Sequence, residues 1–250
     1  MKASTIRKIS FSSFTILLLF IIWIIISTTK NNDMIYPSIG SIFKAVLNCF
    51  KWVNFKLLLM TFLRVIITLA ISLIVCLIII TITLKFPDSY AFFSPIVKIM
   101  RTVPFICVSL FIVLFFKRGI APYIIAFLVI IPIMLEGFLS GVKQINKNII
   151  EDLKLLEISF PKKLFQVYLP LAFPTIMMTI FQTFGLGFKV VIMGEYFAQT
   201  KNSLGLALYD AKAFLEMSTI FAWTIIIVIV VAIIEIIMNY FNNKRNNLIY

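Results

Sequence analysis

Residues 151–174, EDLKLLEISFPKKLFQVYLPLAFP, are the part of this chain whose residue types and spacing most clearly indicate a role. Acidic and basic side chains stand among Leu and Ile, and Pro170 and Pro174 follow four residues apart. Long apolar runs lie on both sides of the segment. A polar, helix-prone segment between membrane spans suits ion pairs and apolar contacts with another protein. The segment is therefore a candidate docking surface.

The composition offers little for catalysis or metal binding. His is absent, which removes the commonest neutral-pH acid–base group and metal ligand. The three cysteines, Cys49, Cys76 and Cys107, are far apart and show no metal-ligand spacing. Asp and Glu total 10 and are scattered, whereas a membrane enzyme needs paired carboxylates, His or a metal cluster at one face. We expect no catalytic residue, no metal and no cofactor in this chain.

The apolar content indicates a membrane protein. Apolar residues make up 62% of the 250 residues and the mean hydropathy is +1.08, whereas about half is usual for a soluble domain. They form long runs, as transmembrane helices do. The net charge of +13 is compatible with nucleic-acid binding. The basic residues lie between the apolar runs, however, and are better explained as membrane-end anchors. We expect membrane lipid, and no nucleic acid, as a partner.

Charged residues bracket six apolar runs, each near the roughly 20 residues that a helix needs to cross the hydrocarbon. The runs cover residues 8–30, 57–85, 95–117, 118–136, 163–189 and 216–240. Lipid offers no partners for backbone N–H and C=O groups, so we expect helices. The sequence thus predicts an all-α, polytopic membrane protein with about six transmembrane helices and one cytoplasmic coupling helix.

The distribution of Lys and Arg predicts that both termini lie in the cytoplasm. The inner segments would hold Lys2, Arg7, Lys8, Lys85, Lys143, Lys147, Lys154, Lys162, Lys163, Lys244 and Arg245. The outer segments would hold Lys30, Lys44, Lys51, Lys56, Lys117, Arg118, Lys201 and Lys212. The first 27 residues lack a small-x-small cleavage site, which favours an uncleaved helix over a signal peptide. Residues 37–50 resemble an amphipathic surface helix with Ser38 as N-cap.

Residues 146–157 predict a short helix because they contain neither Pro nor Gly and carry an apolar stripe at helical spacing. The stripe consists of Ile149, Ile150, Leu153, Leu155 and Leu156, with Glu151, Asp152 and Lys154 facing elsewhere. Ser159 can cap a second helix, with Pro161 in its first turn and Lys162 and Lys163 following. An ordinary amphipathic intracellular loop explains this pattern equally well.

The segment resembles the coupling segment of binding-protein-dependent ABC importer permeases of the type I, MetI-like family. That family carries E-A-A-x-x-x-G and, more than ten residues later, L-P-x-x-x-P. Aligned on Leu169-Pro170, Glu151 matches the motif Glu, whereas Glu157 stands where the family has Gly, and Asp152 and Leu153 replace the two Ala. Further matches, to the nitrate/sulfonate/taurine-type branch, are Pro37-Ser38, residues 61–65, residues 100–104, Gly194-Glu195 and Gly205.

The resemblance implies a permease subunit that moves a small solute by alternating access. It implies as partners two ATPase subunits, a second permease copy and a periplasmic or lipid-anchored solute-binding protein. The chain lacks G-x-x-x-x-G-K-[ST], so a partner must bind the ATP. The residues that would contact the ATPase are Glu151, Asp152, Lys154, Leu155, Leu156, Glu157, Ser159 and Lys162. A secondary transporter or channel without an ATPase is the alternative.

The resemblance divides the chain into three parts and suggests the cargo. Residues 1–56 would form the first helix and an outer amphipathic segment, residues 57–241 the type-1 permease core, and residues 242–250 a cytoplasmic tail. The branch suggests a nitrate-, sulfonate- or taurine-like anion carried across the inner membrane. Residues 208–224 resemble relatives linked to vitamin precursors, which are neutral or aromatic.

Polar and aromatic residues within the spans are candidates for the translocation pathway. They are Phe105, Gln182, Thr183, Lys189 and Glu195. Helix packing explains the small and polar residues near Gln182 equally well. Lys189 and Glu136 are expected near span ends, and Glu195 either closes an outer gate or pairs with Lys189. Pro170 and Pro174 each remove a helix hydrogen bond, so we expect a kink there.

Overall fold

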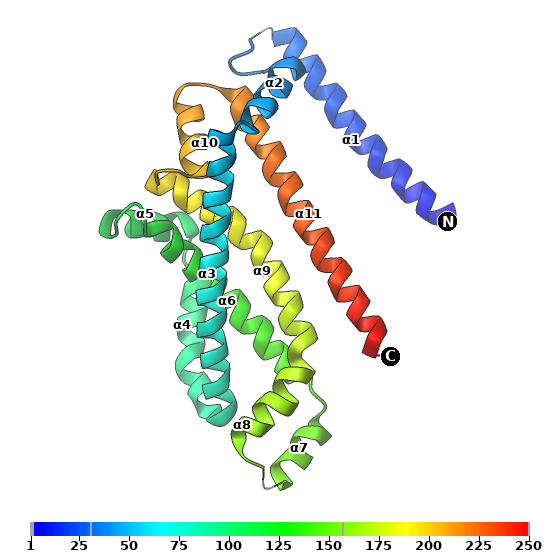
Figure 1. Cartoon of the computed structure of the whole chain (residues 1–250), viewed down its shortest axis with the longest axis vertical. Coiled ribbons are helices and arrows are strands. Elements are labelled where there is room, and N and C mark those ends of the chain that lie inside the picture. The colour runs from blue at the N-terminus through cyan, green and yellow to red at the C-terminus, as the bar shows by residue number, and fades with distance from the viewer. Residues whose placement is uncertain (1–2, 31, 157, 250) are drawn as a thin grey trace. The chain divides into compact units, whose positions relative to one another are not determined.

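A computed structural model describes residues 3–30, 32–156 and 158–249, with no description of the side chains of residues 3–13, 16, 19, 20, 154 and 238–249. Within those ranges the secondary structure is helical and contains no β-strand (Figure 1). The predicted all-α, polytopic class is therefore confirmed. The chain forms two compact units. One comprises Met1–Phe55 and Ala207–Val228, and the other Lys56–Leu206 and Ile229–Tyr250.

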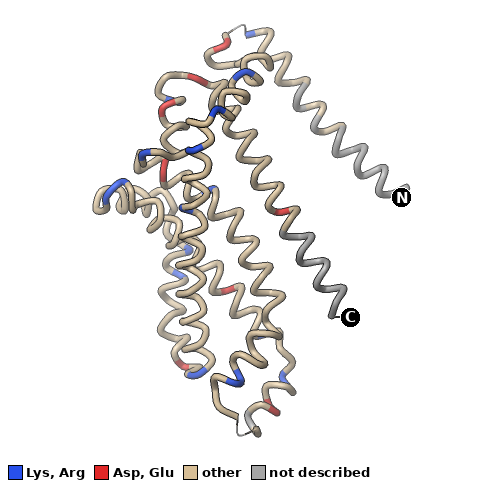
Figure 2. Tube along the Cα trace, in the orientation of Figure 1, with Lys and Arg blue, Asp and Glu red and all other residues tan. Residues whose placement is uncertain are grey.

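The helices follow one another along the chain with short connections. In order they are α1 (Ala3–Lys30), α2 (Ile39–Cys49), α3 (Trp52–Lys85), α4 (Tyr90–Thr102), α5 (Phe105–Phe115), α6 (Ala121–Lys143), α7 (Lys147–Leu155), α8 (Phe160–Lys163), α9 (Leu169–Ala198), α10 (Leu204–Ala213) and α11 (Met217–Ile249). A short 3-10 turn, Pro87–Ser89, precedes α4, and a π-helical turn, Leu164–Tyr168, links α8 to α9. Figure 2 shows few charged residues along the long helices and more at their ends and connections.

Among the described residues, four helices are long and apolar enough to cross a membrane. They are Trp52–Lys85, Ala121–Lys143, Phe160–Ala198 and Met217–Ile237. The predicted third span over residues 95–117 falls on two helices, α4 and α5, which are bent by 98° at the break between them. The first predicted span falls in α1, which has 28 residues. Many of its side chains lie outside the described set, so that span stays a prediction.

Contacts within the larger unit fix the directions of its helices. Gly194, near the end of α9, packs on Pro122 at the start of α6, whereas Gly141 at the end of α6 packs on Thr175 near the start of α9. The two helices are therefore antiparallel. Helix α3 runs beside α6 in the same direction, because its early residue Arg64 meets the end of α9 and its later residue Cys76 meets Ile131. The bent pair α4–α5 therefore carries the chain back across the bundle as one broken span.

Helices α6 and α9 approach closely where α6 carries glycine. A Cβ on Gly137 would come within 2.2 Å of Thr179 Oγ1, and one on Gly141 within 3.1 Å of Thr175 Cβ. Small residues let membrane helices approach until their backbones are near contact, and van der Waals packing then stabilises the pair. This pair is the packed centre of the larger unit, with Ile130, Met134, Phe138 and Phe188 fully buried.

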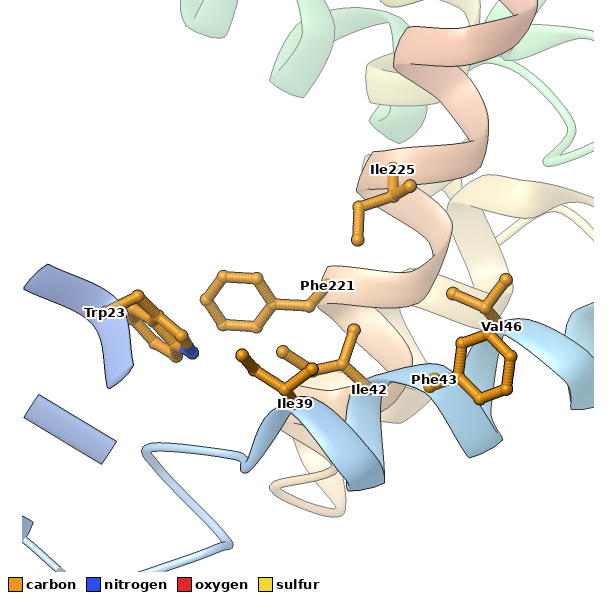
Figure 3. Close-up of a pocket in the computed structure, with 7 residues that line it drawn as sticks. All are labelled: Trp23, Ile39, Ile42, Phe43, Val46, Phe221 and Ile225. Atoms are coloured by element: carbon orange, nitrogen blue, oxygen red, sulfur yellow. The ribbon is translucent and has the colours of Figure 1, made fainter. Parts of the chain in front are cut away.

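The smaller unit brings α1, α2 and the start of α11 around an apolar cavity of about 510 Å³. Ser38 caps α2 as predicted, because its side chain accepts a hydrogen bond from Ser41 N–H. Trp23 Nε1 donates to the carbonyl of Pro37 over 3.3 Å. The rings of Trp23 and Phe221 lie 4.6 Å apart at their centroids and are tilted by 49° to each other. Figure 3 shows Ile39 and Ile42 beside them. The described residues that line this cavity are all apolar.

Gly137→Ala tests the close packing of α6 on α9. The new Cβ would collide with Thr179, a short β-branched side chain that cannot move away by rotation alone. We expect a loss of stability of roughly 1–3 kcal/mol, measured as a lower unfolding temperature of the purified protein in detergent. Gly119→Ala is the control, since a Cβ there meets no atom within 4 Å. Equal unfolding temperatures for the two variants would contradict the packing described here.

Candidate coupling helix and translocation pathway

Helix α7 is a short polar helix that links α6 to α8 at one end of the larger unit (Figure 1). Asn146 caps it, because its side-chain oxygen accepts a hydrogen bond of 3.0 Å from Asn148 N–H. Thr175 Oγ1 donates to Gln144 Oε1 over 3.2 Å and thereby ties the chain before α7 to α9. The predicted helix over residues 146–157 is therefore present but shorter, ending at Leu155.

The side chains of α7 divide into one that is buried and several that face outward. Leu153 is 6% exposed, whereas Leu155 is 84% and Leu156 50% exposed. The prediction of one stripe that includes both Leu153 and Leu155 was wrong, since two residues along a helix are 200° apart. Glu151 and Asp152 are exposed. Glu157 and the side chain of Lys154 lie outside the described set.

The chain then turns into α8 and α9 through an irregular segment. Ser159 occupies the N-cap of α8 as predicted, but its side chain makes no capping hydrogen bond, and the exposed Lys162 follows within the helix. In the π-helical turn, Leu169 N–H donates to the carbonyl of Leu164, one residue further back than in an α-helix. This wide turn comes directly before Pro170, which has no N–H to donate. The irregularity thus accommodates Pro170 at the first turn of α9, while Pro174 lies inside the helix.

The break between α4 and α5 lies beside a cavity of about 420 Å³. Val103 is extended, as the residue before a proline prefers to be. Arg101, Thr102 and Phe105 line the cavity from the break, and Arg101 forms an ion pair with Glu136 of α6. Irregular backbone at membrane depth is tolerated only inside protein or beside a water-filled space. The broken span is therefore a candidate wall of the pathway.

Helix α9 presents a partly polar face to the outside of the single chain. Gln182 and Lys189 are exposed and lie within 20° of each other around the helix axis, because they are seven residues apart. Thr183 is buried and donates to the carbonyl of Thr179, so it does not lie on this face. Helix α9 continues past the predicted span end at Lys189 to Ala198, so Lys189 lies nine residues inside the helix.

Glu195 is fully buried near the end of α9 and is enclosed by donors. Arg64 Nη1 lies 2.8 Å from its Oε1, and Thr61 Oγ1 lies 2.9 Å from its Oε2. The N–H of Gly205 donates to the same carboxylate over 3.2 Å. The alternative that pairs Glu195 with Lys189 was wrong, because Glu195 pairs with the buried Arg64.

The loop between α9 and α10 completes this network. Arg64 also donates to the carbonyls of Lys201 and Asn202, each over 3.2 Å, and Leu204 N–H donates to Thr61 Oγ1 over 3.0 Å. A Cβ on Gly205 would lie 2.4 Å from the backbone nitrogen of Tyr196. Only glycine can therefore bring its N–H this close to Glu195. The sequence marked Arg64, Glu195 and Gly205 separately, but it did not reveal that they meet.

Comparison with known proteins agrees with this architecture. Residues 87–247, more than half of the chain, match the family described as the inner membrane component of binding-protein-dependent transport systems. This chain belongs to that family. The match extends from the start of α4 into α11, so it includes α7, the broken span, Lys189 and Glu195. Arg64 precedes the matched region.

Three relatives of this transport family carry names that indicate what they transport. A Bacillus subtilis protein named as an aliphatic sulfonates transport permease, SsuC, is 26% identical over 141 residues, which are 56% of this chain and 50% of that protein. The glycine betaine transport system permease OpuAB of the same organism is 27% identical over 62% of this chain and 54% of its own length. The glycine betaine/proline betaine permease ProW of Escherichia coli is 28% identical over 45% of this chain and 32% of its own length. This chain spans about half the length of the first two relatives.

The buried pair Arg64–Glu195 can be tested with a double-mutant cycle. Removing one partner leaves the other charge buried without compensation, so we expect Arg64→Met or Glu195→Leu alone to cost about 3–5 kcal/mol. The double variant should lose at least about 1 kcal/mol less than the sum of the single losses. Denaturant unfolding of the purified permease measures each value.

The matched control is the pair Arg101–Glu136, whose side chains are 51% and 45% exposed. The same substitutions there should show a smaller coupling energy, because neither charge is fully enclosed. Additive losses at Arg64 and Glu195 would show that the buried pair contributes no mutual stabilisation.

Proposed function

We propose that this chain is the membrane-spanning permease subunit of an ATP-driven, binding-protein-dependent importer. The observation that carries the proposal is the exposed surface of α7 in a chain that belongs to this transport family. Leu155 is 84% exposed at the end of a polar helix, beside the exposed Glu151 and Asp152. An apolar side chain ringed by polar groups is a typical anchor for a partner protein.

We propose that the partner at α7 is an ATPase subunit. The 250 residues contain no G-x-x-x-x-G-K-[ST], so the proposal assigns ATP binding and hydrolysis to the partner subunit. Glu151, Asp152, Leu155 and Leu156 would form the docking surface, with Lys162 at its edge. Closure of two ATPase subunits would then move α7 and, through it, the connected ends of α6 and α9.

A second permease copy would complete the pathway. Gln182 and Lys189 lie on an exposed face of α9 at membrane depth, where a charge facing lipid is costly. A second copy facing this surface would enclose it and leave a polar passage between the two chains. A solute-binding protein would deliver the cargo to the opposite end from α7.

We propose that the cargo is a small solute with an anionic group. The names of the three relatives are those of sulfonate and betaine permeases rather than of vitamin-precursor permeases. Sulfonates and betaines share a negatively charged end group. The proposed orientation in the cell membrane has both termini and α7 in the cytoplasm, and residues 199–205 on the outer side.

Leu155→Asp tests the docking of the ATPase. The substitution places a charge in the centre of the proposed apolar contact, so we expect at least a tenfold loss of co-purified ATPase and of transport. Co-expression with the ATPase encoded nearest to this gene, followed by purification through a tag on the permease, measures the complex. Leu215→Asp is the matched control, since Leu215 is 50% exposed in the loop after α10 and Asp tolerates its positive φ of 59°.

Unchanged complex formation and transport in Leu155→Asp would exclude α7 as the docking site. If the unaltered permease recovers no ATPase, a secondary transporter or channel becomes the better explanation.

The orientation predicts which end of the molecule reagents reach from each side of the membrane. The background is Cys107→Ser, because Cys107 is exposed whereas Cys49 and Cys76 are buried. Burial raises the pKa of the Cys49 thiol to about 11, which further suppresses its reaction near neutral pH. A cysteine at Asn148 should react with a membrane-impermeant maleimide only after cells are opened. A cysteine at Lys201 should react in intact cells, and the reverse pattern would invert the orientation.

A further inference from the structure

Two opposite charges inside the helices of the larger unit have no ion-pair partner among the described residues. They are Lys189 of α9 and Glu235 of α11, and both side chains are exposed. Helix α9 carries one further charged residue, Glu195, which is paired with Arg64. Unpaired charges within membrane spans are costly and usually mark a route for a solute or ion.

The two residues lie at different positions along their helices. Lys189 precedes the end of α9 at Ala198 by nine residues, or about 13 Å at a rise of 1.5 Å per residue. Glu235 follows the start of α11 at Met217 by eighteen residues, or about 27 Å. Sequence analysis placed Lys189 near a span end, where a long side chain reaches the interface. Helix α9 extends nine residues beyond Lys189, whereas the apolar span in α11 ends at Ile237, two residues after Glu235.

The carboxylate of Glu235 lies against α9 at a position without a side chain. A Cβ on Gly185 would come within 3.3 Å of Glu235 Oε1 and within 3.8 Å of Val231 Cγ1. Lys189 is one helical turn further along α9, and residues four apart lie on neighbouring positions of one face. Gln182 lies one turn before Gly185 and is exposed. One face of α9 therefore brings together an ammonium group, an amide and, through Gly185, a carboxylate.

We propose that Lys189 and Glu235 form a solute site that takes a small zwitterion. The carboxylate or sulfonate of the solute lies at Lys189 and its cationic group lies at Glu235, whose carboxylate reaches α9 because Gly185 has no side chain. A solute with only a negative charge meets repulsion from Glu235, and one with only a positive charge meets repulsion from Lys189. A zwitterion compensates both charges at once, which matters most in a site of low dielectric constant. This inference rests on the proposed function and narrows its cargo.

Two solutes of the same shape test the proposal. Glycine betaine carries a trimethylammonium group and a carboxylate, and 3,3-dimethylbutyrate replaces the ammonium nitrogen with carbon. Equilibrium dialysis with the permease–ATPase complex in nanodiscs measures the binding of each labelled solute. We expect the unaltered complex to bind glycine betaine at least tenfold more tightly than 3,3-dimethylbutyrate.

The variants separate the two charges. Glu235→Gln should weaken glycine betaine binding at least tenfold and leave 3,3-dimethylbutyrate binding equal or tighter, whereas Lys189→Gln should weaken both at least tenfold. Lys201→Gln and Glu216→Gln, in exposed connections, are the matched controls and should change neither affinity.

Three results would overturn the proposal. The first is equal or absent binding of the two solutes by the unaltered complex, and the second is an equal loss of both in Glu235→Gln. In the third, both single variants bind the two solutes as the unaltered complex does but are less stable, and the double variant regains the stability. That result would show that Lys189 and Glu235 pair only with each other. Complex formation and ATP hydrolysis are measured on the same samples. Their absence would contradict the proposed function, whereas their presence without a change in solute preference contradicts only the zwitterion site.

Discussion

The buried ion pair between Arg64 and Glu195 is the interaction on which the arrangement of the larger unit depends. It joins α3 to the end of α9, and the hydrogen bonds from Thr61 and Gly205 attach the following loop to the same carboxylate. Inside a membrane, separating the pair would leave both charges without water and without a partner, which costs free energy. The end of the bundle opposite α7 is therefore held as one piece.

That constraint determines how motion at α7 can reach the pathway. Helix α7 and the short α8 connect α6 to α9. These two long helices pack closely at Gly137 and Gly141, where a larger side chain would not fit. Packed helices of this kind shift as units because their interface has little free volume. In the proposed mechanism, a displacement of α7 would be transmitted to α6 and α9 together, while the network around Glu195 holds their far ends to α3. The face of α9 with Gln182 and Lys189 would then move relative to the proposed second chain.

Local signals in the sequence predicted the local structure well. The cap at Ser38 and the short polar helix before Pro161 follow from residue types within a few positions of each other, whereas Ser159 takes the N-cap position without a side-chain hydrogen bond. The helix bounds were wrong where charge was taken as a sign of the membrane surface. Lys189 lies inside its helix, and no sequence pattern distinguishes a charge at the interface from one that faces a polar passage. The pairing of Arg64 with Glu195 spans 131 positions, and helical periodicity carries no information about which helices meet.

The charges of this membrane unit thus fall into two classes that only the structure separates. Arg64 and Glu195 are neutralised by each other and by backbone groups, and an enclosed pair of this kind favours a single arrangement of helices. Lys189 and Glu235 are exposed in the single chain, and their electrostatic cost is not offset by any partner in its described part. In the proposed site, a zwitterion bound between Lys189 and Glu235 would offset that cost. The enclosed pair stabilises the frame, and the second pair would supply the chemistry of the proposed passage.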